Sequence, residues 1–79
     1  MADLKGLIEA VARALADQPD AVSVRESERR GATVYELQVA SGDLGRVIGR
    51  RGRTAQSIRT LVRAAAAKDG REVDVDFVD

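Results

Sequence analysis

Two glycines that enclose two arginines, Gly49-Arg50-Arg51-Gly52, interrupt an otherwise helical stretch in the second half of the chain. Apolar residues before and after them, such as Val47 and Ile58, recur at the spacing of helices that face a core. Glycine is a poor residue for a helix interior, but it adopts backbone conformations that other residues avoid and lets another molecule approach closely. The interruption therefore predicts two helices joined by a tight turn, with Arg50 and Arg51 exposed at its tip.

Three segments have the periodicity of helices. The first ends before Pro19, because proline disfavours a helical conformation for the residue that precedes it. The second covers about residues 44–48, and Ser41 or Asp43 is expected to cap it. The third follows the glycine pair and ends near Gly70. The expected apolar stripe is Leu4, Leu7, Ile8, Val11 and Leu15 in the first helix, and Ala55, Ile58, Leu61, Val62 and Ala65 in the third.

Three further segments alternate apolar and polar residues, which predicts strands with one buried face. The polar segment 27–31 separates the first two strands and ends in a glycine, so it predicts a hairpin turn. A three-stranded sheet with three helices on one face buries every apolar stripe, and we predict a single α+β domain over residues 1–79. The expected buried strand positions are Val22 and Val24, then Tyr35, Leu37 and Val39, and finally Val73, Val75 and Phe77.

Charge is distributed unevenly along the chain. The whole chain has 13 basic and 13 acidic residues and a net charge of zero, which by itself argues against a nucleic-acid ligand. Residues 43–63, however, have a net charge of +5, whereas the segments before and after them have net charges of −2 and −3. The positive charge is thus concentrated around the glycine pair, where the start of a helix also attracts anions. A run of phosphates along a nucleic-acid backbone would use these features together.

The chain contains no histidine and no cysteine. It therefore lacks the most common general base, the thiol nucleophile and the preferred zinc ligands, and we expect neither an enzyme nor a metal or cofactor site. Residues 1–5 lack the basic leader and apolar run of a secretory signal, and no stretch is long and apolar enough for a membrane helix. A cytoplasmic location without a membrane partner is expected.

Two nucleotide-binding motifs that are rich in glycine fail on spacing. A P-loop requires a glycine where Val47 stands and a lysine where Arg53 stands. A dinucleotide fingerprint requires the spacing G-x-G-x-x-G, whereas Gly45, Gly49 and Gly52 follow G-x-x-x-G-x-x-G and no strand leads directly into them. Neither motif explains the glycine pair.

The segment from Val47 to Arg59 resembles the signature of the KH domain, whose GxxG loop clamps about four nucleotides of single-stranded nucleic acid. The basic loop, the aliphatic residues before it and Ile58 after it all match that signature. The predicted order, helix, strand, strand, helix, helix, strand, matches the type II arrangement αββααβ. Over essentially the whole chain the sequence is similar to the small bacterial single-KH RNA-binding proteins of the KhpA type.

The resemblance implies a protein that binds single-stranded RNA, with single-stranded DNA as an alternative ligand. The backbone amides of residues 49–52 and the loop arginines would hold phosphates, while bases would lie in an aliphatic groove that includes a strand residue near Val39. With Tyr35 and Phe77 expected in the core, little base stacking and weak binding are expected. The implied RNA-binding residues are Arg46, Val47, Ile48, Gly49, Arg50, Arg51, Gly52, Arg53, Thr54, Ile58 and Arg59.

A weakly binding domain gains affinity when it acts together with a second domain. The resemblance implies that partner as a second copy, which gives a homodimer, or as a larger KH protein of the KhpB or Jag type, which gives a heterodimer. It also implies a role as an RNA chaperone or post-transcriptional regulator linked to cell-wall homeostasis and cell shape. The alternative is a protein interaction module whose arginine-rich face docks an acidic partner and binds little RNA of its own.

Overall fold

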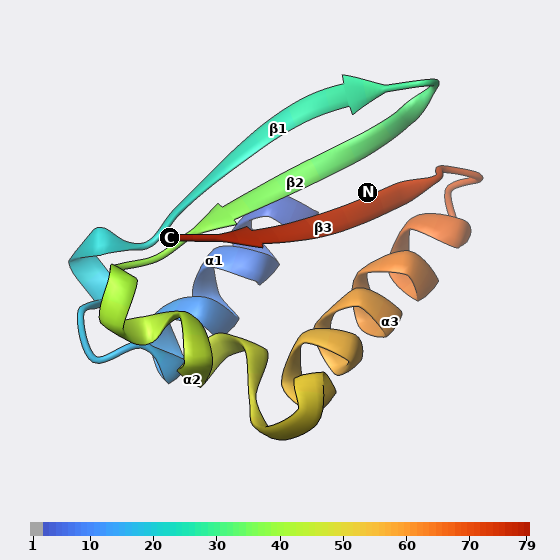
Figure 1. Cartoon of the computed structure of the whole chain (residues 1–79). Coiled ribbons are helices and arrows are strands. Elements are labelled where there is room, and N and C mark those ends of the chain that lie inside the picture. Colours follow the sequence, from blue (N-terminus) through green and yellow to red (C-terminus); the bar gives the residue numbers. More distant parts are fainter. Residues whose placement is uncertain (1–2) are drawn as a thin grey trace.

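The computed structural model describes residues 3–79, and Figure 1 shows a sheet with three helices packed against one face. Residues 1 and 2, which the expected domain includes, lie outside the described residues. The predicted order αββααβ is confirmed. The elements are α1 (Leu4–Leu15), β1 (Ser23–Arg29), β2 (Ala32–Gln38), α2 (Leu44–Ile48), α3 (Arg53–Ala67) and β3 (Val73–Val78), with the 3-10 turns η1 (Pro19–Ala21), η2 (Ser41–Asp43) and η3 (Arg50–Gly52) between them.

The sheet is mixed, with β2 between β1 and β3. β1 is antiparallel to β2, with Ser23 opposite Gln38, and β3 is parallel to β2, with Thr33 beside Val73. A parallel pair requires a crossover, which the segment through α2 and α3 supplies. β3 is an edge strand because it pairs with β2 alone. Its C-terminal end lies beside α2 and the start of α3 (Figure 1).

The β1–β2 hairpin is longer and its turn is tighter than the sequence predicts. The expected turn over residues 27–31 is wrong: β1 continues to Arg29, and only Arg30 and Gly31 form the turn, with φ of 55° and 83°. Two positive φ values suit the right-handed twist of a two-residue hairpin. The end of β1 is exposed on both faces, so it lacks the apolar alternation by which strands are recognised.

The core lies between the sheet and the helices. Ile8 of α1, Leu37 of β2 and Val75 of β3 are among its fully buried members. The predicted stripe of α3 is right at Ala55, Ile58 and Val62 but wrong at Leu61, which is 52% exposed, and Ala66 is buried in its place. Leu61 follows helical periodicity, but no element of the described chain covers the outer flank of α3 where it lies.

Asp43 is a buried carboxylate that connects two loops. It is 2% exposed, and its Oδ2 accepts a hydrogen bond from the backbone N–H of Gln18 at 2.9 Å. Its Oδ1 lies 3.6 Å from Nε of Arg46. The expected capping by Ser41 or Asp43 is wrong, because neither side chain bonds to the start of α2. Asp43 instead attaches the segment after α1 to the start of α2.

The helices are short, and the longest of them carries several charged side chains. Among residues 3–79 no helix is long and apolar enough to cross a membrane. α3, the longest helix of Figure 1, has 15 residues and carries three arginines, Arg53, Arg59 and Arg63. Its buried face is narrow and packs against β3 and α1.

Candidate nucleic-acid interface

The glycine pair forms the tight turn between α2 and α3 that the sequence predicts. Gly49 has φ 79° and ψ 173°, and Gly52 has φ 73° and ψ 12°, two regions that favour glycine. Arg51 between them is also left-handed, with φ 59°. α2 therefore ends at Ile48, and α3 begins in a new direction after the turn.

Gly49 also lies close to the start of α3. A Cβ atom at this position would lie 2.7 Å from Cβ of Thr54 and 3.1 Å from its backbone nitrogen, and it would overlap the Thr54 hydroxyl. A Cβ atom at Gly52 would meet open space. The side chain of Thr54, one of the predicted binding residues, therefore packs against the loop at Gly49. Gly49 is required for both its conformation and its small size, and Gly52 for its conformation alone.

The backbone amides of the loop fall into two groups. The N–H of Gly49 donates to the carbonyl of Gly45 at 2.9 Å, and the N–H of Gly52 donates to the carbonyl of Gly49 at 3.1 Å. The N–H groups of Arg50 and Arg51 have no backbone acceptor within residues 3–79. The expectation that the amides of residues 49–52 hold phosphates stays a prediction. The amides of the two glycines already have a backbone acceptor, so the amides open to a ligand belong to the arginines.

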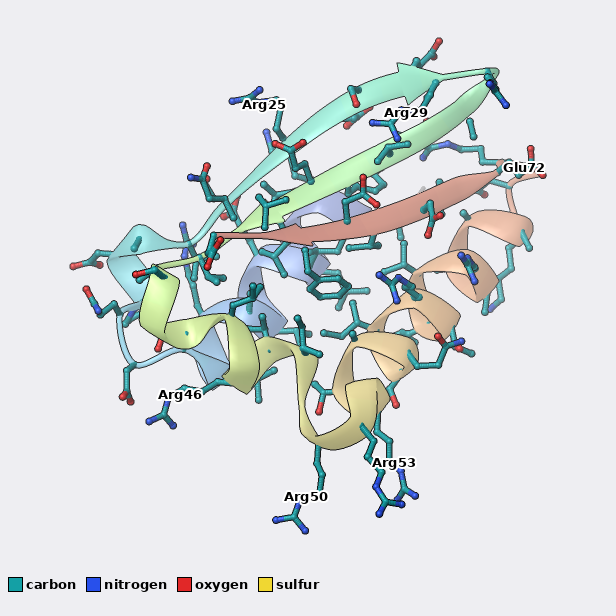
Figure 2. All side chains as sticks on the ribbon, in the orientation of Figure 1. Arg25, Arg29, Arg46, Arg50, Arg53 and Glu72 are labelled. Atoms are coloured by element: carbon teal, nitrogen blue, oxygen red, sulfur yellow. The ribbon has the colours of Figure 1, made fainter. Side chains whose placement is uncertain are left out.

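Three arginines extend from the loop and the first turn of α3. Arg50, Arg51 and Arg53 are exposed, and none of them pairs with a carboxylate in the part of the chain that the structure describes. Figure 2 shows Arg50 and Arg53 pointing away from the body of the domain. Within residues 3–79 no carboxylate pairs with these charges, which makes this end of the molecule attractive to anions.

A cleft of about 370 Å³ lies beside the loop, between the start of α3 and the end of β3. The strand that lines this cleft is β3, because β3 is the edge strand beside α3. Val39, which the sequence places near the groove, is buried in the core instead. Ile48, Gly52, Ala55 and Arg59 line one side of the cleft, and Asp76, Phe77 and Val78 line the other.

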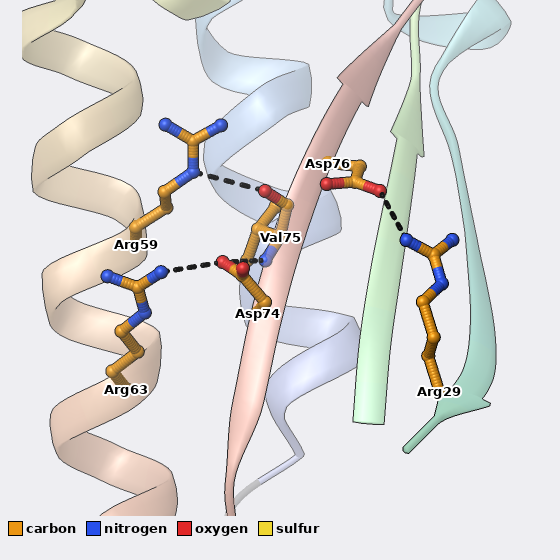
Figure 3. A network of polar contacts seen from close by, with 6 residues as sticks. All are labelled: Arg29, Arg59, Arg63, Asp74, Val75 and Asp76. Carbon is orange, nitrogen blue, oxygen red and sulfur yellow. Dashed lines mark hydrogen bonds and ion pairs between the residues drawn. The ribbon is translucent and has the colours of Figure 1, made fainter. Parts of the chain in front are cut away.

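Arg59 and Phe77 lie against each other at this cleft. Nε of Arg59 donates to the carbonyl of Val75 at 3.1 Å, and the guanidinium carbon lies 5.0 Å from the centre of the Phe77 ring. Figure 3 shows Arg59 reaching from α3 to β3. Phe77 is half-buried rather than fully in the core as expected. The cleft therefore has an aromatic ring and a planar guanidinium group, both of which can stack on a base.

Three predicted binding residues lie elsewhere. Val47 is 0% exposed and lies in the core, and Ile58 is buried and borders the surface between α1 and α3. Arg46 pairs with Asp17 at 2.9 Å and with Asp43 at 3.6 Å, and it points away from the loop in Figure 2. Proximity in sequence places all three near the glycine pair, but the direction of each side chain on its helix decides what it contacts.

Sequence reasoning missed the residues that β3 contributes to the cleft. Asp76, Phe77 and Val78 are far from the loop in sequence and reach it only because β3 pairs beside β2. One signal was present: Phe77 is the only phenylalanine of the chain and stands at the end of its strand. The pattern of alternation does not show which end of the strand meets the loop.

The loop, the adjoining cleft and the order αββααβ define a type II KH domain. A family model described as "KhpA/KhpB, KH domain" matches residues 5–77. The chain therefore belongs to the KhpA/KhpB family of KH domains.

Curated relatives match over nearly their whole length. "RNA-binding protein KhpA" of Caldanaerobacter subterraneus subsp. tengcongensis is 49% identical over 72 residues, which cover 91% of this chain and 96% of that protein. The protein of the same name from Halalkalibacterium halodurans is 45% identical over 76 residues, which cover 96% of this chain and all (100%) of that protein. Neither name describes an enzyme.

Solved structures of Era share the fold. Era of Aquifex aeolicus bound to GDP and AlF4 matches with a TM-score of 0.65 and 19% sequence identity, over 95% of this chain and 29% of that chain. Era in complex with MgGDPNP and a segment of 16S ribosomal RNA matches with a TM-score of 0.65 and 18% identity, over the same shares of the two chains, 95% and 29%. At such identities the likeness concerns the fold alone.

Proposed function

We propose that this chain binds single-stranded RNA through the loop at residues 49–52 and the cleft beside it. The observation that carries the proposal is the meeting of two unlike surfaces: three exposed arginines without a carboxylate partner in the described chain adjoin a cleft with aliphatic, aromatic and guanidinium walls. A nucleic-acid strand has phosphates along one side and base faces along the other, and it matches this arrangement. The names of the curated relatives agree with it.

The loop supplies the phosphate contacts in this proposal. The N–H groups of Arg50 and Arg51 have no backbone acceptor in residues 3–79, and their guanidinium groups add charge-assisted hydrogen bonds. The start of α3 contributes its helix dipole at the same place. Phosphate contacts of this kind fix the position of the strand and carry no sequence information.

The cleft supplies the base contacts. Its volume of about 370 Å³ suits unstacked bases rather than a duplex. Arg59 is held over Phe77 by its bond to the Val75 carbonyl, so its plane is preorganised for stacking. The half-buried Asp76 accepts hydrogen bonds and favours a base with an amino group, such as cytosine. Selectivity therefore comes from a few contacts and is modest.

Reversing the charge of the loop tests this function. In the variant Arg50→Asp/Arg51→Asp, aspartate tolerates the left-handed backbone of residue 51, so the fold is retained. Removal of two charge-assisted hydrogen bonds, each worth about 1.5–3 kcal/mol, lowers the affinity for a labelled RNA oligomer by about a hundredfold or more. The control Lys5→Glu/Arg25→Glu changes the net charge equally at exposed positions away from the loop and keeps the affinity. A DNA oligomer of the same sequence compares the two ligands.

The same experiment decides between RNA binding and the alternative of a protein interaction module. A folded loop variant that binds RNA as well as the unmodified chain contradicts the proposal and favours an acidic protein as the ligand of the arginines. Circular dichroism and the urea midpoint establish that the variant is folded.

We further propose that the chain acts as a homodimer through an apolar groove between α1 and α3. Leu7, Leu15 and Leu61 are exposed there at 36%, 37% and 52%. The adjoining outer face of α3 carries one charged residue, Arg53 at its N-terminal end, and is otherwise uncharged and partly small, with Ser57 and Ala64. Two copies of α3 can therefore approach closely around a two-fold axis beyond Arg53. The groove faces away from β3 and leaves the RNA cleft open.

Sedimentation equilibrium of the unmodified chain and of Leu61→Lys tests this interface. We expect a concentration-dependent dimer that the variant does not form while it remains folded, because Leu61 contributes little to the core. A monomer at all concentrations contradicts homodimerisation. Mixing with a KH protein of the KhpB type then shows whether a heterodimer forms on the same face.

In the cell we propose a cytoplasmic role as an RNA chaperone or post-transcriptional regulator that acts with a KhpB-type partner and bears on cell-wall homeostasis and cell shape. The membership of the KhpA/KhpB family supports this role. Crosslinking and sequencing of bound transcripts, in cells with and without the partner, tests it. Crosslinks that do not depend on the loop arginines contradict it.

A further inference from the structure

A second basic concavity lies at the opposite end of α3 from the glycine loop. It has a volume of about 610 Å³ and is formed by the hairpin turn, the end of α3 and the start of β3. Four arginines line it, Arg29, Arg30, Arg63 and Arg71, together with the acidic residues Glu72 and Asp74. The sequence segments that supply these arginines are far apart, so the charge pattern of the chain does not reveal the cluster.

Two of the four arginines form no ion pair within the described residues. Arg63 pairs with Asp74 at 2.9 Å, and Arg29 approaches Asp76 at 4.0 Å (Figure 3). Arg30 and Arg71 have no carboxylate partner within residues 3–79. These two guanidinium groups can therefore bind an external anion without first breaking an ion pair.

Arg71 is held in place by neutral oxygens. Its Nη2 donates to the hydroxyl of Tyr35 at 3.3 Å and to Oγ1 of Thr33 at 3.5 Å. The hydrogen bond to Tyr35 also raises the pKa of the Arg71 guanidinium. Glu26 and Asp69 raise that pKa further through their negative charges. Because the hydrogen-bond partners are uncharged, the side chain is oriented without an ion pair.

The concavity and the RNA cleft are joined along one seam. Arg59 lines the cleft, and Arg63, one helical turn further along α3, lines the concavity. Figure 3 shows the two side chains next to each other, both directed at β3. With a rise of 1.5 Å per residue, α3 separates the glycine loop from the concavity by about 20 Å. The acidic residues of the seam, Asp74 and Asp76, are the ones that Arg63 and Arg29 approach.

We infer that a longer RNA strand leaves the cleft, follows the seam between α3 and β3, and is held by phosphate contacts from Arg30 and Arg71. This inference rests on the proposed RNA binding at the glycine loop. The loop and cleft hold about four nucleotides, so a longer strand must continue past them. The seam leads to a second group of arginines, two of which form no ion pair in the described chain. The second site makes affinity depend on the length of the RNA.

The variant Arg30→Asp/Arg71→Gln removes this site and keeps the fold. Asp-Gly is a favoured sequence for a two-residue hairpin turn with positive φ, so Arg30→Asp suits the backbone. Glutamine at position 71 still donates to an oxygen acceptor. The control Arg25→Glu/Lys5→Gln changes the net charge by the same amount at exposed positions outside the seam.

Fluorescence anisotropy at several salt concentrations compares a tetranucleotide with an oligomer of roughly twelve nucleotides of the same repeated sequence. For the unmodified chain and the control we expect tighter binding of the longer oligomer. The seam variant binds the longer oligomer about threefold to tenfold more weakly, keeps its affinity for the tetranucleotide, and has a salt slope smaller by about 0.7 for each phosphate that it no longer neutralises. With the longer oligomer alone, the NMR amide signals of Gly31 and Arg71 shift.

Two other outcomes overturn the inference in different ways. If the seam variant binds both oligomers as the control does, the seam does not hold RNA, and the glycine loop remains the binding site. If the unmodified chain binds neither oligomer, the proposed RNA binding fails and the seam site fails with it.

Discussion

Replacement of Gly49 by alanine is expected to destabilise the domain far more than the same replacement at Gly52. Both glycines have positive φ, but their surroundings differ. At Gly49 the added methyl group meets Thr54, with 2.7 Å between the two Cβ atoms. At Gly52 it points into open space. The two variants therefore separate the cost of backbone conformation from the cost of overlap.

The magnitudes follow from these two costs. The backbone region of Gly49, φ 79° and ψ 173°, is almost confined to glycine and costs another residue about 1–3 kcal/mol. Overlap with Thr54 adds about 1–3 kcal/mol, because the start of α3 must shift. Alanine at Gly52, in the left-handed region, costs about 1–2 kcal/mol. A chain of this length has a total stability of about 4–12 kcal/mol, so Gly49→Ala removes a large part of it.

Urea denaturation followed by circular dichroism measures these free energies of unfolding. With a slope of about 1 kcal/mol per molar urea, the midpoint of Gly49→Ala falls by at least about 2 M. Gly45→Ala is the matched control, because Gly45 lies inside α2 with open space around it, and alanine there stabilises by about 0.5–1 kcal/mol. A double-mutant cycle with Thr54→Gly isolates the overlap. Equal decreases at Gly49 and Gly52 would refute the reasoning.

Three further changes probe other parts of the domain. Arg51→Asn raises the urea midpoint slightly, because asparagine tolerates the left-handed backbone of residue 51 better than arginine; a lower midpoint contradicts this. Asp43→Ala lowers the free energy of unfolding by about 1–3 kcal/mol, because the N–H of Gln18 loses its acceptor. An unchanged free energy of unfolding in the same assay would show that water replaces the carboxylate. Arg59→Lys keeps the charge but removes the planar guanidinium group that lies over the Phe77 ring. Fluorescence anisotropy should therefore show weaker binding of a tetranucleotide. The control Arg25→Lys leaves binding unchanged.

The element order could be predicted because local signals agreed with one another. The glycine pair placed the end of α2 and the start of α3, and the apolar spacing predicted α1 and β3 as elements. The predicted stripe of α1 is wrong at Leu7 and Leu15, which are exposed. The hairpin was harder, because the exposed end of β1 carries no apolar alternation and is a strand only through its pairing with β2. Leu61 shows the same limit on a helix: periodicity marks an apolar face, but only the neighbours decide whether that face is covered.

Some residues of the candidate site could be predicted from the sequence, and others could not because their roles depend on packing. The loop arginines and glycines were evident from the sequence, since their types and spacing suit an anion whatever surrounds them. The roles of Val47 and Arg46 were not, because the burial of the valine and the two ion pairs of the arginine depend on the packing of α2. Phe77 entered the site through the pairing of β3 with β2, which joins distant parts of the chain.

The sequence by itself determined the local conformations: where helices stop, where the backbone needs glycine, and where positive charge gathers in one segment. These depend on interactions between residues a few positions apart, which a pattern records directly. Only the tertiary structure decided which arginines are neutralised, which aromatic ring borders the cleft, and that Arg30 and Arg71 line the same concavity. Those outcomes depend on distances between residues far apart in the chain, and such distances exist only after the sheet and the helices have packed.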